Sequence, residues 1–206
     1  MDIRDLDRRA VRASVEVVAR ATADDLRRPT PCADWTLADL LAHMTVQHRG
    51  FAAAARGAGD DLAVWRVQPL GDDAVSVYAE AAEHVLAAFA EDGVLERAFT
   101  LPELAQSGSD RSPAFPAAQA IAFHFIDYLV HAWDVAQALG VEFTADPELV
   151  EVAWPIAQMV PDGEQRRLPG AAFQPSLAAP EGGTRFDQVL ALLGRSTART
   201  TSLPSG

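Results

Sequence analysis

The sequence predicts an all-α protein: a four-helix bundle followed by a less regular C-terminal extension. Apolar residues recur at three- and four-residue spacing in four long segments, and helix-capping or helix-breaking residues bound these segments. Four long helices with modest connections are typical of a bundle. We therefore expect a bundle over residues 1–140 and an extension, packed on the bundle, over residues 141–206.

The second bundle helix has the clearest start. Thr36 precedes an apolar run and Asp39 follows three residues later, as in a capping box. In the fourth helix, Pro116 suits the first turn and Gly140 suits the C-terminal cap. The bundle helices are expected over residues 4–21, 37–57, 72–90 and 116–140.

The extension has weaker patterns. Helical spacing returns at residues 147–159 and 185–193, on either side of a passage rich in proline and glycine. One short strand is expected near Phe173. The last residues are small and polar and lack apolar periodicity, so we expect a disordered tail from about residue 197.

Charge and composition limit the class of protein. A net charge of -12 at pH 7 argues against nucleic acid and anionic membranes as partners, because a phosphate-binding surface must be basic. The N-terminal residues carry charges of both signs and lack the apolar stretch of a signal peptide. The most apolar run, residues 117–140, contains ionisable side chains that a membrane interior would penalise. We expect a soluble, cytoplasmic protein.

Cys32 is the only cysteine, so an internal disulfide and a multi-cysteine metal site are both excluded. The thiol itself has two interpretations: a small buried apolar group near the start of the second helix, or a reactive group activated by that helix's N-terminus. Neither a Gly-x-Ser-x-Gly turn nor a glycine-rich phosphate loop occurs, which gives serine-hydrolase and nucleotide-binding functions little support.

The spacing of histidine and aspartate indicates a metal site. Asp127 and His131 are one helical turn apart and share a face of the fourth helix. His43 lies on the apolar face of the second helix, which must meet the bundle interior. Two histidines and a carboxylate from facing helices are a familiar arrangement for zinc or non-haem iron with open coordination positions.

A second interpretation treats these residues as core polar groups, in which the aspartates of the fourth helix accept hydrogen bonds from its histidines. His43 alone also fits a core histidine. His48 lies about 140° round the helix from His43 and is expected to face away from any ion held there. His84 has no partner at metal spacing and is expected at the surface or rim.

Several stretches resemble a known family. Residues 30–36 read TPCADWT, residues 39–43 DLLAH, residues 127–134 DYLVHAWD and residues 190–195 LALLGR. With these motifs, the chain is similar to the DinB-like superfamily, and in particular to mycothiol-dependent maleylpyruvate isomerase-like metal-binding proteins. The motifs occur in the same order as in the family, and the resemblance covers most of the chain.

The resemblance implies an up-down-down-up four-helix bundle that holds a divalent metal through His43, Asp127 and His131. Zn²⁺ is the expected ion, with Ni²⁺ and Fe²⁺ as alternatives, and mycothiol is the implied cosubstrate. His124 and Asp134 would orient the ligands or relay a proton. The resemblance leaves the oligomeric state open, a homodimer included.

The leading functional hypothesis is a metal-dependent enzyme that uses mycothiol or a similar low-molecular-weight thiol to isomerise a small molecule or to transfer the thiol. The alternative is a non-catalytic DinB-like module that binds a metal or a small molecule. In a third hypothesis, Cys32 is the nucleophile.

Overall fold

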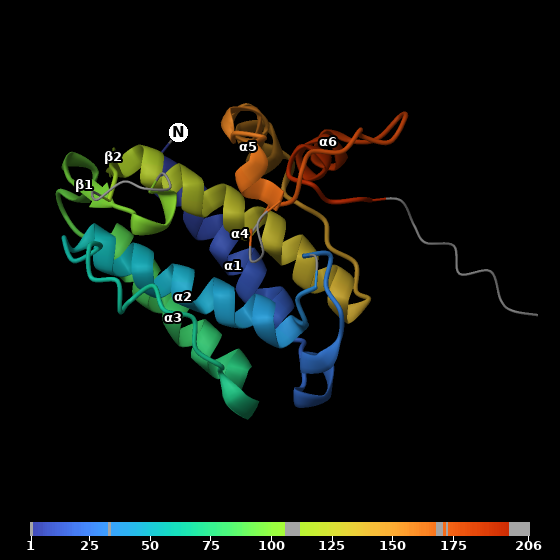
Figure 1. The fold of residues 1–206 in the computed structure, drawn as a ribbon, viewed down its shortest axis with the longest axis horizontal. Helices are drawn as coiled ribbons and strands as arrows, with labels where there is room; N and C mark the ends of the chain where they lie inside the picture. The colour runs from blue at the N-terminus through green and yellow to red at the C-terminus, as the bar shows by residue number, and fades with distance from the viewer. Residues whose placement is uncertain (1, 33, 106–111, 168–170, 172, 198–206) are drawn as a thin grey trace, which may run out of the picture. The chain divides into compact units, whose positions relative to one another are not determined.

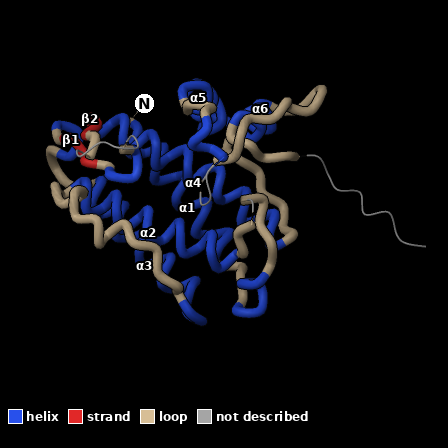
Figure 2. Tube along the Cα trace, in the orientation of Figure 1, coloured by secondary structure: helices blue, strands red, loops and turns tan. Residues whose placement is uncertain are grey.

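The computed structural model describes residues 2–32, 34–105, 112–167, 171 and 173–197, without the side chains of Asp72 and Gln165. The all-α prediction is confirmed: the described residues form six α-helices, several short 3₁₀ turns and one pair of three-residue strands (Figures 1 and 2). The chain divides into two compact units, Met1–Thr144 and Ala145–Gly206.

Four helices build the first unit: α1 (Ile3–Val18), α2 (Leu37–Ala55), α3 (Ala74–Phe89) and α4 (Ala117–Leu139). α1 packs along α4 and α2 packs along α3, and contacts of α2 with α4 and of α1 with α3 join the two pairs (Figure 1). Every predicted end of these helices agrees with the observed end to within one turn. The up-down-down-up order of the bundle stays a prediction.

Local chemistry explains where α2 and α4 begin and end. Thr36 Oγ1 accepts a hydrogen bond from the Asp39 N–H at 3.3 Å, and Asp39 Oδ2 accepts one from the Thr36 N–H at 2.9 Å. This is the capping box that the sequence predicts. α4 ends at Leu139 because Gly140 takes the left-handed conformation, with φ of 68°, that other residues adopt at a cost.

Two strands that the sequence did not predict lie in the stretch between α3 and α4. β1 (Ala98–Thr100) pairs antiparallel with β2 (Ala114–Pro116), and Phe99 stands opposite Phe115 (Figure 2). Phe99 is fully buried in the apolar core. Three residues are too few to produce a strand periodicity that can be recognised in a sequence.

The second unit contains α5 (Pro147–Met159) and α6 (Arg185–Leu192), which pack against each other. Both helices were predicted, and the bounds of α5 agree at both ends. The strand expected near Phe173 is wrong, since that residue lies in a bend.

The irregular passage of the second unit is held together by hydrogen bonds to the buried side chain of Arg166 and not by strand pairing. The Arg166 guanidinium donates hydrogen bonds to four backbone carbonyls, those of Val160, Pro161, Gln174 and Leu192. The expected disordered tail falls almost wholly on residues 198–206, outside the described residues, and packing of the extension on the bundle stays a prediction.

Among the described residues, the helices are too short or too polar for any of them to cross a membrane. This includes α4, the most apolar of the long helices, which carries four ionisable residues on the side that the first unit buries.

The capping box at α2 gives a first prediction. Replacing Thr36 with alanine should lower the free energy of unfolding by about 1 kcal/mol, because the Asp39 amide loses its acceptor. Thr144→Ala serves as the control, since Thr144 is exposed and lies before the N-cap residue of α5. Equal denaturation midpoints for the two variants in a reversible urea titration would disprove the cap.

Candidate metal centre

His43 on α2 and the pair Asp127 and His131 on α4 come together in the first unit. His131 Nε2 lies 3.2 Å from Asp127 Oδ1, and His43 Nε2 lies 4.0 Å from Asp127 Oδ2. One ligand atom from each residue lies within 4.8 Å of the other two. Two imidazole nitrogens and a carboxylate oxygen therefore converge on a space that one ion could occupy, and this donor set suits Zn²⁺ or Fe²⁺.

The group lies at the edge of the interior. The side chain of His131 is fully buried, whereas those of His43 and Asp127 are 15% and 16% exposed. The ring of Trp35 lies beside His43, with 4.9 Å between ring centroids. The Nε2 atoms of His43 and His131 are themselves buried, so the solvent-exposed part of the group consists of other atoms of His43 and Asp127.

Asp127 and His131 form a tightly coupled buried pair. Burial works against the ionisation of Asp127, but the charge and hydrogen bond of His131, together with the charge of His43, lower the pKa of the carboxyl overall. Burial lowers the pKa of the His131 imidazole, yet the charge and hydrogen bond of Asp127 help to raise that pKa well above its ordinary value. Each group therefore favours the charged form of the other.

Asp134 contacts His131 from the other side of the ring. His131 Nδ1 lies 2.8 Å from Asp134 Oδ2, and both side chains are fully buried. An Nδ1–H that donates to this carboxylate leaves the lone pair of the neutral ring on Nε2, the nitrogen that faces Asp127. The arrangement orients His131 as a carboxylate orients a metal-binding histidine.

Cys32 belongs to the same hydrogen-bonded group. Its thiol is 2% exposed, and Sγ lies 3.1 Å from Asp134 Oδ2 and 3.9 Å from His131 Nδ1. Cys32, His131 and Asp134 form a second set whose ligand atoms all lie within 4.8 Å of one another. This set is fully buried, whereas two residues of the set with His43 and Asp127 are partly exposed.

His124 lies in a separate buried cluster. Its Nδ1 is 2.6 Å from Asp7 Oδ1, its Nε2 is 3.1 Å from His48 Nδ1, and all three side chains are fully buried. The ring of His48 also stacks on Tyr128 at 3.9 Å. His124 acts on Asp127 through its charge, which helps to lower the pKa of that carboxyl.

Sequence reasoning missed Asp7 and the burial of His48. Asp7 occupies the same face of α1 as the buried residues Ala10, Val11 and Ser14, and this position was the signal that could have identified it. His48 was expected to face away from an ion held by His43. Because α2 is buried on most of its sides, His48 nevertheless points into the core.

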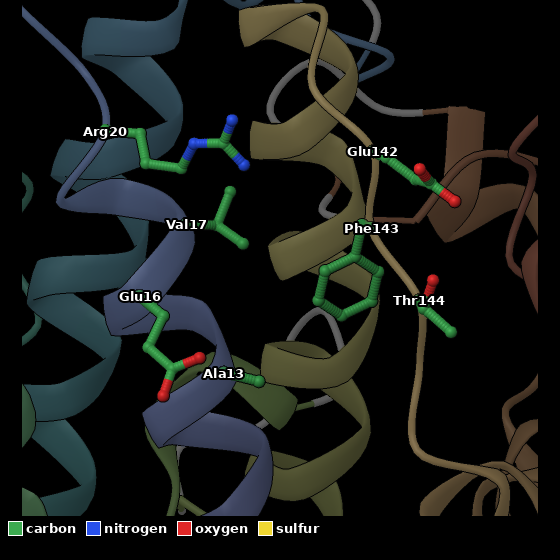
Figure 3. A pocket seen from close by; sticks show the side chains of 7 residues that line it. All are labelled: Ala13, Glu16, Val17, Arg20, Glu142, Phe143 and Thr144. Atoms are coloured by element: carbon green, nitrogen blue, oxygen red, sulfur yellow. The ribbon is translucent and has the colours of Figure 1, made fainter.

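His84 lies at the surface, and its Nε2 is 2.6 Å from Arg56 Nη1. A hollow between α1 and the segment after α4 contains none of the histidines of the chain (Figure 3). It is lined by Ala13, Glu16, Val17, Arg20, Glu142, Phe143 and Thr144.

Residues 8–136 match the model of the family described as Mycothiol maleylpyruvate isomerase N-terminal domain. The chain belongs to this family. The matched range contains His43, Asp127 and His131, and the family resemblance seen in the sequence is confirmed.

Two uncharacterized proteins of Mycobacterium tuberculosis, Rv0738 of strain H37Rv and MT0763 of strain CDC 1551, resemble this member of the family along most of its length. Each is 30% identical to it over 193 residues, which cover 91% of this chain and 94% of the relative.

Solved structures show the same fold. A crystal structure of a histidine-to-alanine mutant of the mycothiol-dependent maleylpyruvate isomerase superposes with a TM-score of 0.56 at 11% identity. A crystal structure of the isomerase itself superposes with a TM-score of 0.53 at 13% identity. Both alignments cover 75% of this chain and 68% of the isomerase chain. At such identities the likeness establishes the fold alone.

The buried cluster gives a second prediction. Asp7→Asn should lower the free energy of unfolding by roughly 2 kcal/mol, because His124 loses a charged hydrogen-bond partner in a site without solvent. Asp5→Asn, on an exposed position of the same helix, should change it by less than about 0.5 kcal/mol. The contribution of the cluster to stability would be refuted if chemical denaturation gave the same value for both variants.

Proposed function

We propose that this chain binds a divalent metal ion, with Zn²⁺ as the best fit, through His43, Asp127 and His131. We propose further that it uses mycothiol or a similar low-molecular-weight thiol in an isomerisation or a thiol transfer. The observation that carries the proposal is that three ligand atoms from two helices lie within 4.8 Å of one another. Two of the three residues are partly exposed, and the chain belongs to the mycothiol maleylpyruvate isomerase family.

The ligand set supports a catalytic type of site. Three protein ligands leave at least one coordination position of a tetrahedral ion for water or substrate. Ni²⁺ and Fe²⁺ accept the same imidazole and carboxylate ligands and remain alternatives for the native ion. Asp127 supplies negative charge that offsets part of the dication, and Asp134 keeps His131 Nε2 directed at the converging atoms.

A bound divalent ion supplies one piece of chemistry, a lowered pKa of a coordinated thiol, so that a thiolate is available at neutral pH. The protein then has to admit the thiol and hold it in place. Trp35 and the exposed edges of His43 and Asp127 mark the side of entry. An isomerisation requires the thiol to add across a double bond and to leave after rotation about the resulting single bond. A cytoplasmic location is part of the proposal, since thiols stay reduced there.

One observation favours the alternative, a binding module without catalysis. If the ion sat instead between Cys32, His131 and Asp134, the site would be fully buried and closed to substrates. The cobalt-substituted protein distinguishes the two sites. A thiolate-to-cobalt absorption band before any thiol is added, and its loss in Cys32→Ser, would indicate the closed site. A band that appears only when mycothiol is added indicates the open one.

The ligand assignment is tested by substitution. His43→Ala and Asp127→Asn should each lower the zinc affinity by more than about 100-fold, because each removes one of three ligands or its charge. His84→Ala should leave the affinity unchanged, since His84 lies at the surface against Arg56. Zinc affinity is measured by competition with a chromophoric chelator, and circular dichroism confirms folding. Wild-type affinity in either ligand variant would reject the three-residue site.

The role of Asp134 is tested separately. Asp134→Asn should lower the zinc affinity by about 10–100-fold without changing the number of ions bound, because an amide orients His131 less firmly than a carboxylate. Cys32→Ser is the matched control, since a hydroxyl can still donate to the same carboxylate oxygen. If Asp134→Asn binds zinc as tightly as Cys32→Ser does, the orienting role is wrong.

A further inference from the structure

An acidic residue outside the predicted site is hydrogen-bonded to α2, the helix that carries His43. Glu103 is in the 3₁₀ turn η4 (Pro102–Leu104), which follows β1. Gln47 Nε2 donates a hydrogen bond of 2.6 Å to Glu103 Oε2. The Gln47 side chain is 7% exposed, so the carboxylate of Glu103 is anchored to the interior although the residue as a whole is exposed.

The position of Gln47 places Glu103 next to the proposed ligands. Gln47 follows His43 by one turn of α2, so the two side chains share a face of this helix. α2 contacts α4, which carries Asp127. The negative charge of Asp127 adds to the rise in the pKa of the Glu103 carboxyl.

The environment of Glu103 suits proton transfer at neutral pH. Burial of its carboxyl raises the pKa of Glu103 to about 7, the hydrogen bond from Gln47 partly opposes this shift, and Asp127 adds to it. A carboxyl with a pKa near the working pH is present in both forms and can therefore accept a proton and return it. Gln47 on α2 and Asp127 on α4 are the groups that set this balance.

We propose that Glu103 is the proton acceptor and donor of this site, the catalytic residue that takes the S–H proton of the incoming thiol and later gives it back. The inference rests on the proposed function. In the first step the S–H bond breaks, its electron pair stays on sulfur, and the proton moves to the carboxylate of Glu103. Thiol and carboxylate become thiolate and carboxylic acid, and the reverse transfer restores both when the thiol leaves.

The other ionisable groups around the centre are engaged elsewhere. Asp134 is fully buried behind His131, where it accepts hydrogen bonds from that ring and from Cys32. His124 is fully buried between Asp7 and His48. Glu103, by contrast, is an exposed residue whose partly buried carboxylate accepts a hydrogen bond from Gln47.

The first test locates Glu103 relative to the metal without using activity. The carboxyl ¹³C resonance of Glu103 is assigned by its absence in Glu103→Gln and titrated with pH in the metal-free and the zinc-loaded protein. The pKa of Glu103 should lie near 7 without zinc and fall by about half a unit with zinc, because a nearby dication favours the carboxylate, and a shift of this size keeps both forms populated at pH 7. Glu96, an exposed residue, serves as the control resonance and should not shift. An unchanged Glu103 pKa on zinc binding would overturn the proposal.

The second test follows the proton itself. Calorimetry of mycothiol binding to the zinc-loaded protein at pH 7, in buffers of different ionisation enthalpy, gives the number of protons released per thiol. Glu103→Gln should release at least about half a proton more than the wild type or Glu96→Gln, because the S–H proton then passes to the buffer. The substitution keeps the side-chain shape and an oxygen that can accept from Gln47.

The outcomes separate this inference from the proposed function. Equal proton release by Glu103→Gln and the wild type, with mycothiol bound, rejects Glu103 as acceptor and leaves the thiol-using function standing. A loss of zinc affinity in Glu103→Gln as large as that in Asp127→Asn would make Glu103 a ligand and also overturn its role as acceptor. A wild-type protein that binds zinc but no mycothiol, or no zinc at all, would reject both proposals.

Discussion

The burial of four ionisable side chains on one helix is the constraint on which the rest of the first unit depends. α4 carries His124, Asp127, His131 and Asp134 within a segment that its neighbours cover almost completely. A buried ionisable group without a partner costs several kcal/mol, so each of the four requires a group of complementary chemistry nearby. α1 contributes a carboxylate, α2 contributes two imidazoles, and the segment before α2 contributes a thiol.

These partners divide the polar face of α4 into a closed part and an open part. At the closed part, Asp7 and His48 bind His124, and none of the three side chains is exposed. Hydrogen bonds from α1 and α2 to one ring fix how these helices sit on α4. At the open part, His43 faces Asp127 with one edge exposed to solvent. The closed cluster thus fixes the position of α2 on α4, and these are the two helices whose side chains converge at the open part.

The sequence predicted those features that repeat along a helix, and it missed those that depend on a single contact. The four bundle helices and α5 follow from apolar spacing and caps, and Asp127 and His131 follow from their one-turn separation. β1 and β2 are too short to show a period. Glu103 lies in a turn, and its carboxylate accepts a hydrogen bond from Gln47, 56 positions earlier in the chain, which no sequence pattern indicates.

Contacts among protein groups position the candidate metal centre. Asp134 and Cys32 contact one side of His131, Asp127 contacts the other, and the Trp35 ring lies against His43. Asp127 raises the pKa of the His131 imidazole, and His131 helps to lower the pKa of the Asp127 carboxyl, so each group favours the charged form of the other. An ion bound between His43, Asp127 and His131 would require a neutral His131 ring, and would therefore have to replace the charge that His131 supplies to Asp127.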